Sequence, residues 1–92
     1  MTIGDAVSVW PIGQPERAET GQILTLSDNP QTAAVVFDEL PLFLAQAVRD
    51  DPDYEVAFDE RNGRIVMVLS REAEGPWLDV GGCGFYEMMV PV

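Results

Sequence analysis

The dipeptide Asn62-Gly63 constrains the fold of this chain more than any other local feature. Asn-Gly is the preferred pair for a two-residue type I′ turn, because both central residues of that turn need positive φ. We therefore expect an antiparallel hairpin in which Arg61 lies opposite Arg64. Apolar residues recur at alternate positions in the two flanking stretches, which are the expected strands 54–60 and 64–70.

The register of this hairpin assigns its side chains to two faces. Asp59 is expected opposite Val66, and Phe58 opposite Met67. One face is apolar and should join the core: Val56, Phe58, Met67 and Leu69. The other face combines carboxylates with valines: Glu55, Ala57, Asp59, Val66, Val68 and Ser70.

The other strands follow from alternating apolar residues between turn-forming residues. Three strands are expected before the middle of the chain, at residues 6–10, 22–26 and 32–37. After the hairpin, a loop leads to residues 77–80, and a final strand is expected at residues 85–90. The glycine-rich segment between them, which contains Cys83, should form a bend or a bulge.

The spacing of apolar residues changes from that of a strand to that of a helix after residue 38. The residues at helical spacing are Leu40, Phe43, Leu44, Ala47 and Val48. They predict one helix at about residues 39–49. We expect Asp38 to cap its N-terminus and Glu39 to complement the helix dipole there.

The order of the expected elements, β-β-β-α-β-β-β, predicts an α+β fold that is mainly antiparallel β. We expect a small bent sheet or barrel with one helix. A chain of 92 residues has enough surface to bury for one compact core, so we expect a single domain, residues 1–92.

The N-terminal part of the chain resembles SH3-like barrels of the KOW and Tudor type. The likeness covers residues 3–38 and is carried by three segments: 3–9 (IGDAVSV), 20–23 (TGQI) and 34–38 (AVVFD). It implies a small barrel that acts as a non-enzymatic binding module for peptides, modified residues or RNA. The expected helix is an insertion relative to that pattern.

The residue types that the chain lacks exclude several kinds of chemistry. It contains no histidine and no lysine, and its only cysteine is Cys83. A histidine-based triad, a histidine metal site and a Walker or Schiff-base lysine are therefore excluded. Six carboxylates lie between residues 50 and 60, but their spacing does not fit an EF-hand loop. We expect no enzyme activity, no metal and no cofactor, and we interpret Cys83 as a small residue in a tight bend.

The charge balance indicates the kind of partner. Sixteen carboxylates against five arginines give a net charge of −11. Such a surface repels nucleic acid and anionic membranes, so we expect no direct binding to either. In size and charge only, the chain resembles small acidic phage-encoded inhibitors such as the anti-CRISPR proteins. That resemblance implies a nucleic-acid mimic, whose carboxylates imitate the phosphate charge of a duplex.

The first residues give no sign of export. They contain no positively charged segment followed by a long apolar stretch. No window of the chain approaches the roughly 18 uninterrupted apolar residues of a membrane-spanning helix. We therefore expect a cytoplasmic protein.

Together these features predict a non-enzymatic acidic protein-binding module. It would bind, and block or regulate, a basic protein surface, for example one that itself binds nucleic acid. The acidic hairpin would steer the partner electrostatically, and valines or tryptophans would anchor it. The residues expected to meet the partner are Asp53, Glu55, Asp59, Glu60, Val66, Val68, Trp10 and Trp77.

An alternative function stays open at this point. The chain could be an SH3-like adaptor, or a self-associating domain that forms a homodimer, and could recognise a peptide through an apolar groove. Its acidity would then be incidental and would reflect genome composition or solubility. The sequence leaves open whether Trp10 and Trp77 belong to the core or to an interface.

Overall fold

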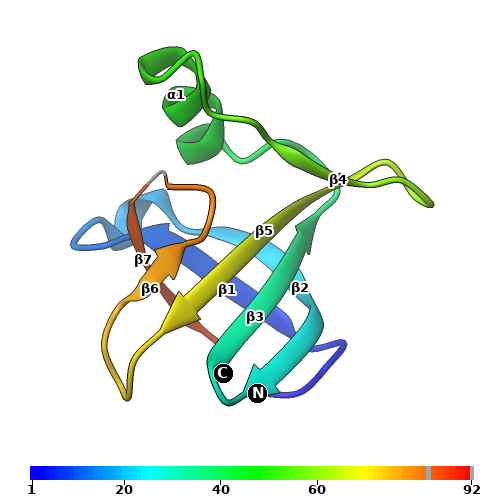
Figure 1. Ribbon diagram of the computed structural model, residues 1–92, viewed down its shortest axis with the longest axis vertical. Coiled ribbons are helices and arrows are strands. Elements are labelled where there is room, and N and C mark those ends of the chain that lie inside the picture. Colours follow the sequence, from blue (N-terminus) through cyan, green and yellow to red (C-terminus); the bar gives the residue numbers. More distant parts are fainter. Residues whose placement is uncertain (83, 92) are drawn as a thin grey trace.

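The computed structural model describes residues 1–82 and 84–91. In this part of the chain, six antiparallel strands close into a small barrel with one helix at its end (Figure 1). Each barrel strand pairs with the next, and the last pairs with the first. The barrel strands are β1 (Ala6–Pro11), β2 (Glu19–Asp28), β3 (Gln31–Phe37), β5 (Arg64–Arg71), β6 (Trp77–Asp79) and β7 (Phe85–Met89). The predicted α+β class is confirmed, and the barrel is compatible with the SH3-like resemblance.

The segment between β3 and β5 leaves the barrel. It carries helix α1 (Leu42–Asp50) and then the short strand β4 (Ala57–Asp59), which pairs with the beginning of β5. Four strands follow the helix in the described chain, one more than the predicted order, because β6 and β7 are separate strands. A short 3-10 helix, η1 (Pro15–Arg17), lies between β1 and β2. The bend predicted around Cys83 lies outside the described residues.

Strand β2 is bent so that it pairs with both of its neighbours. Its first residues pair with β1 and its later residues with β3, and a register shift between Ile23 and Thr25 leaves Leu24 outside the ladder. A bulge of this kind bends a strand and increases its twist, as a small closed barrel requires. Gly21 lies at the inner side of this bend, where an added Cβ would lie 2.6 Å from Cγ1 of Val35. Any larger residue at position 21 would force the core to move.

Inward-facing side chains fill the barrel. Val7 and Val9 are fully buried, as the alternation in β1 predicts. The other strands contribute Ile23, Ala33, Val35, Phe37, Ile65, Met67, Leu69, Trp77 and Tyr86. Burial of one large apolar side chain contributes about 1.5–3 kcal/mol, so this cluster is the main source of the favourable free energy of folding.

Helix α1 lies at one end of the barrel and inserts two buried side chains, Phe43 and Leu44, into the core (Figure 1). The ring of Phe43 lies with its centroid 6.3 Å from that of Phe37 and 5.2 Å from that of Tyr86. The helix therefore continues the barrel core beyond the ends of the strands. Two members of the predicted apolar stripe are exposed instead, Leu40 and Val48.

The helix starts later than the sequence predicts. Pro41 occupies the N-cap position, and no side chain of the helix start caps it, so the prediction of Asp38 as the cap is wrong. Glu19 of β2 takes that role, because its carboxylate accepts a hydrogen bond of 2.5 Å from the Leu42 N–H. A carboxylate is favourable at this position because the helix N-terminus carries a partial positive charge. The same contact ties the helix to the barrel.

The predicted hairpin forms, but its turn is longer than the expected type I′ turn. Asp59 lies opposite Arg64, so four residues form the loop between them. Within this loop only Gly63 has positive φ, at 67°, whereas a type I′ turn needs positive φ at Asn62 as well. The Asp59 carbonyl accepts bonds from the N–H groups of Asn62 and Gly63, at 3.2 and 2.7 Å. Its carboxylate also accepts bonds from the Arg61 N–H and the Asn62 side chain, which together favour the longer loop.

The observed register differs from the predicted one by two residues. An even shift leaves every side chain on its predicted face and changes only its neighbours. Met67 and Leu69 are accordingly in the core. The placement of Phe58 in the core is wrong, because Phe58 is 60% exposed. The predicted strand 54–60 is reduced to the three residues of β4, which lie beyond the barrel (Figure 1).

Phe43→Ala should destabilise the protein by about 3 kcal/mol, because it leaves a cavity between the helix and the rings of Phe37 and Tyr86. Leu42→Ala is the matched control, since Leu42 is the adjacent helix residue and is 75% exposed. It should change the free energy of unfolding by less than about 0.5 kcal/mol. Urea denaturation measures both values. Equal effects of the two substitutions would contradict a core role of Phe43.

Candidate protein-binding groove

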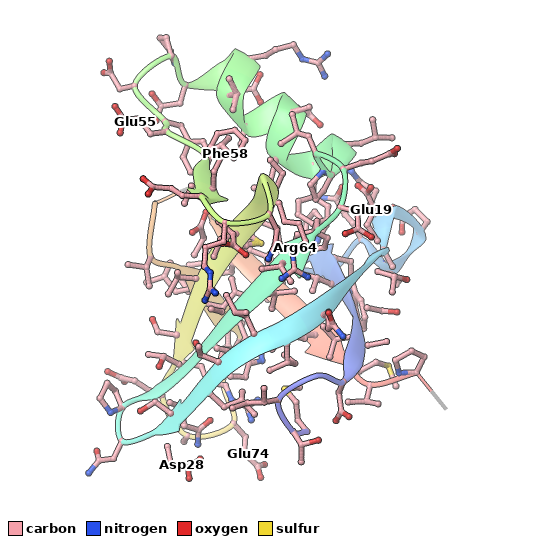
Figure 2. The ribbon with its side chains drawn as sticks, turned by 90° about the vertical axis from the view of Figure 1, so that its right-hand side faces the viewer. Glu19, Asp28, Glu55, Phe58, Arg64 and Glu74 are labelled. Atoms are coloured by element: carbon pink, nitrogen blue, oxygen red, sulfur yellow. The ribbon has the colours of Figure 1, made fainter. Side chains whose placement is uncertain are left out.

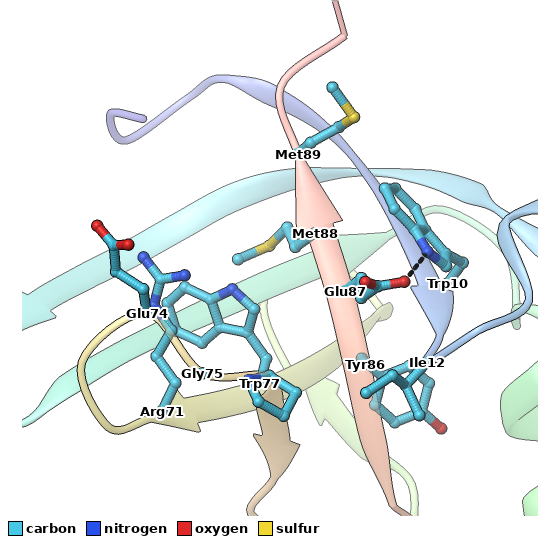
Figure 3. A pocket seen from close by; sticks show the side chains of 11 residues that line it. Trp10, Ile12, Arg71, Glu74, Gly75, Trp77, Tyr86, Glu87, Met88 and Met89 are labelled. Atoms are coloured by element: carbon cyan, nitrogen blue, oxygen red, sulfur yellow. Dashed lines mark hydrogen bonds between the residues drawn. The ribbon is translucent and has the colours of Figure 1, made fainter.

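The barrel is closed unevenly on the two sides of β7. On one side β7 pairs with β1 from Tyr86 to Met89. On the other side it pairs with β6 through only two residue pairs, Trp77 with Tyr86 and Leu78 with Phe85. Beyond these pairs the turn that joins β5 to β6 diverges from β7. A groove of about 400 Å³ lies in this opening (Figure 3).

The walls of the groove are mainly aromatic and sulfur-containing. The apolar side chains that line it are Trp10, Ile12, Pro76, Trp77, Tyr86, Met88 and Met89. Trp77 is 6% exposed and belongs largely to the core, whereas Trp10 is half-buried. Ile12 and Met89 are about half exposed, at 49% and 50%. These two residues and Trp10 give the groove an accessible apolar surface.

Two polar contacts fix the orientation of the tryptophans. The indole N–H of Trp10 donates a hydrogen bond of 2.6 Å to the carboxylate of Glu87, its cross-strand neighbour (Figure 3). The Arg71 guanidinium lies 4.4 Å from the centroid of the Trp77 ring. Arg71 also donates from Nε to the side-chain oxygen of Gln31, at 2.6 Å. The groove is therefore lined by side chains that are already ordered.

The charges at the groove are unbalanced. Glu74 and Glu87 line it together with Arg71. Within the described chain, the one ion pair joins Arg64 to Asp59, at 3.5 Å, so neither glutamate is neutralised by an arginine. The cation of Arg71 is engaged by the Trp77 ring. The groove therefore offers carboxylates to a cationic ligand.

A second hollow of about 470 Å³ adjoins the groove and shares Arg71 and Pro76 with it. Its apolar surface comes from Leu78 and Phe85, a cross-strand pair of β6 and β7. These side chains are 41% and 51% exposed. The surface around the groove therefore carries exposed apolar area on the outside of the barrel.

The structure separates the residues predicted to meet a partner into three groups. Trp10 and Trp77 both line the groove. Asp53 and Glu55 lie between α1 and β4, and Asp59 and Glu60 lie at the hairpin, at the end of the barrel that carries α1 (Figure 1). Val66 and Val68 lie on the outer side of β5, half-buried and 39% exposed respectively.

The sequence predicts only Trp10 and Trp77 of the groove. Nine lining residues are missing from that prediction: Ile12, Arg71, Glu74, Gly75, Pro76, Tyr86, Glu87, Met88 and Met89. Alternation in the last strand predicts that Glu87 points outward, but no local pattern places it beside Trp10. That pairing joins the two ends of the chain, which local periodicity does not report.

Asp59 has a structural role in the hairpin. Its carboxylate accepts hydrogen bonds from the Asn62 side chain and the Arg61 N–H, and it lies close to Arg64. These contacts, the bond from Asn62 first, keep the pKa of Asp59 below its ordinary value. A charge reversal at Asp59 would therefore alter the loop as well as the surface.

Asp79 is the one buried carboxylate among the described residues, and it also has structural contacts. Its two oxygens accept hydrogen bonds of 2.8 Å from the Tyr54 hydroxyl and from the Gly81 N–H. The first of these bonds ties the segment after α1 to β6. No group of three or more acidic or cysteine side chains in the described chain is arranged to hold a metal ion.

Comparisons with known proteins give no match to a protein family, a curated protein or a solved structure. They therefore lend no support to the resemblance to phage-encoded inhibitors. Among the described residues, no helix has the length and apolar character needed to cross a membrane.

Asp59→Asn should make the protein less sensitive to acid. The lowered pKa of Asp59 means that its carboxylate stabilises the folded state above about pH 4 and that this contribution is lost as the pH falls through the lowered pKa. Asparagine does not titrate, so the loss of stability between about pH 5 and pH 2 should be smaller in the variant. Denaturant unfolding at several pH values measures it.

Glu60→Gln is the control for this prediction, because Glu60 is the exposed neighbour of Asp59 in the same loop. It should leave the pH dependence of unfolding close to that of the unmodified protein. If Asp59→Asn retained the full pH dependence, the contacts of the Asp59 carboxylate would not stabilise the fold.

Proposed function

We propose that this protein is a non-enzymatic acidic module that binds a basic segment of a partner protein in the groove between β7 and the β5–β6 turn. By occupying that segment it would block or regulate the partner. The observation that carries the proposal is the combination of ordered tryptophans with the unneutralised carboxylates of Glu74 and Glu87 in one groove.

The apolar part of the groove supports binding to a protein segment. Ligand sites are typically hollows of about 300–1,000 Å³ lined by apolar and aromatic groups with a few placed polar groups. Tryptophan and tyrosine also contribute a large share of the energy at protein interfaces. The indole of Trp10 is held by Glu87, so it would lose little conformational freedom on binding.

The charge supports a cationic partner. The net charge is −11, and in the described chain the only ion pair involves Asp59. Exposed carboxylates lie at both ends of the molecule, with Glu55 near the helix and Asp28 and Glu74 at the far end (Figure 2). A field of one sign over the whole surface accelerates the approach of a cationic partner and is screened by salt.

The sequence prediction placed the partner at the acidic hairpin, and the proposal now distinguishes the two surfaces. The groove combines carboxylates with an apolar anchor, and anchors of this kind supply most of the affinity at an interface. The acids Glu55 and Glu60 are exposed, and Glu55 lies at the opposite end of the molecule from Glu74 of the groove (Figure 2). They would contribute to steering, and the groove would contribute the contacts.

Two variants with equal charge test the assignment. Glu74→Gln with Glu87→Gln removes both groove carboxylates, and Glu55→Gln with Glu60→Gln removes two carboxylates at the other end. The first variant should bind a basic, apolar peptide about tenfold more weakly at low salt, and the second less than about threefold more weakly. The probe is an acetylated hexapeptide of three Arg-Val repeats. The change in tryptophan fluorescence on adding the peptide measures its affinity.

The result that would overturn the groove proposal is a larger loss in the second variant than in the first. That outcome would place the partner at the hairpin. If both variants lost affinity equally and only slightly, and affinity decreased steeply with salt, binding would depend on the overall charge and on neither surface.

A further inference from the structure

The backbone of β7 has an unpaired edge inside the groove. The Ile12 N–H donates to the Phe85 carbonyl at 3.1 Å, which identifies this pair as a hydrogen-bonded one. Antiparallel strands alternate between hydrogen-bonded and non-hydrogen-bonded pairs, so Glu87 and Met89 also direct their peptide groups toward β1. Met88 lies between them and directs its N–H and its carbonyl the other way, away from β1.

On the side away from β1, the pairing of β7 with β6 ends before Met88. The bond from the Asp79 N–H to the Gly84 carbonyl, at 2.9 Å, and the pair of Trp77 with Tyr86 set the register there. Continued pairing would place Gly75 opposite Met88. Gly75 instead forms part of the turn, where its N–H donates to the Glu72 carbonyl at 3.0 Å. Within the described residues, no backbone hydrogen bond joins Met88 to this turn.

We propose that the partner segment binds in an extended conformation and adds a strand to β7 at Met88, where its backbone hydrogen-bonds to the Met88 N–H and carbonyl. This inference rests on the proposed function and specifies how the groove is used. Unpaired strand edges accept extended peptides in this way, with affinity from the backbone bonds and specificity from alternate side chains.

The surroundings of Met88 define the chemistry of the added strand. Side chains of an added strand alternate between the two faces of the sheet. On the outer face they would lie beside Glu87, which favours arginine or lysine there. On the inner face they would lie beside Met88 and Trp77, which favours an apolar residue. The expected ligand is therefore a short strand in which basic and apolar residues alternate.

A second copy of this chain is a poorer occupant of the same edge. Each copy has a net charge of −11, so two copies repel one another. The unpaired edge of β4 is short, since this strand contains three residues and ends at Asp59. The groove carboxylates favour a cationic chain instead.

Amide hydrogen exchange tests the proposal at single residues of one strand. In the unbound protein the Met88 N–H should exchange much faster than those of Glu87 and Met89, which point toward β1. On addition of the acetylated hexapeptide of three Arg-Val repeats, exchange at Met88 should slow by at least about tenfold, while the two neighbours should change little. Nuclear magnetic resonance resolves the three amides.

Peptide and protein variants separate this proposal from the proposed function. The same hexapeptide N-methylated at every backbone nitrogen keeps the side chains and charges but has no backbone N–H groups, so it should bind at least about tenfold more weakly. Met88→Pro removes the outward N–H of the protein and should have a similar effect, since proline is tolerated where an edge N–H faces away from the sheet. Met88→Leu keeps the N–H and should bind within about twofold of the unmodified protein.

The outcomes are distinguishable. Binding of the hexapeptide without protection of Met88, or equal binding of the N-methylated peptide, would overturn strand addition and leave the groove function standing. Absence of any binding at low salt would overturn both proposals. Protection of Met88 that depends on protein concentration without peptide would identify a second copy as the occupant. If Met88→Pro does not fold, the exchange data and the N-methylated peptide decide alone.

Discussion

The pairing of the first strand with the last is the interaction on which the rest of this structure depends. Without the ladder between β1 and β7, the sheet would have two long unpaired edges and its apolar inner face would be open to water. The pairing of β7 with β6 is much shorter, with two residue pairs. Closure therefore rests mainly on β1, and the weakly paired side of β7 becomes the groove. The same constraint stabilises the core and leaves the groove open.

The sequence predicts well those features that depend on neighbouring residues. Alternation identifies five of the six barrel strands, all except β6, and helical spacing identifies α1. Local rules fail where a side-chain hydrogen bond outside the pattern decides the outcome. The helix starts at Leu42 because the carboxylate of Glu19, in strand β2, accepts a hydrogen bond from the first N–H of the helix. The Asn62-Gly63 turn is longer because Asp59 accepts several hydrogen bonds in the loop, which turn propensity does not include.

The groove was only partly predictable for the same reason. Trp10 and Trp77 attract attention as single residues, since an exposed tryptophan often marks an interface. Their neighbours do not, because Glu87 and Met88 meet Trp10 and Trp77 only after the two ends of the chain pair. The acidic hairpin is conspicuous in sequence because its carboxylates are consecutive. In the fold, the Asp59 carboxylate is engaged in hydrogen bonds of the loop. Glu55 lies at the opposite end of the molecule from Glu74 of the groove (Figure 2).

The arginines and the carboxylates differ in how far they take part in contacts within the fold, and this difference links the stability of the barrel to the proposed binding. Three of the five arginines are used within the fold, since Arg17 bonds to Gln46 of the helix, Arg64 lies beside Asp59, and Arg71 covers Trp77. By contrast, the majority of the carboxylates form no ion pair in the described chain. Such an arrangement lowers stability through self-repulsion and leaves the negative charge exposed. A bound cationic segment would relieve that repulsion, so binding should be coupled to an increase in the stability of the barrel.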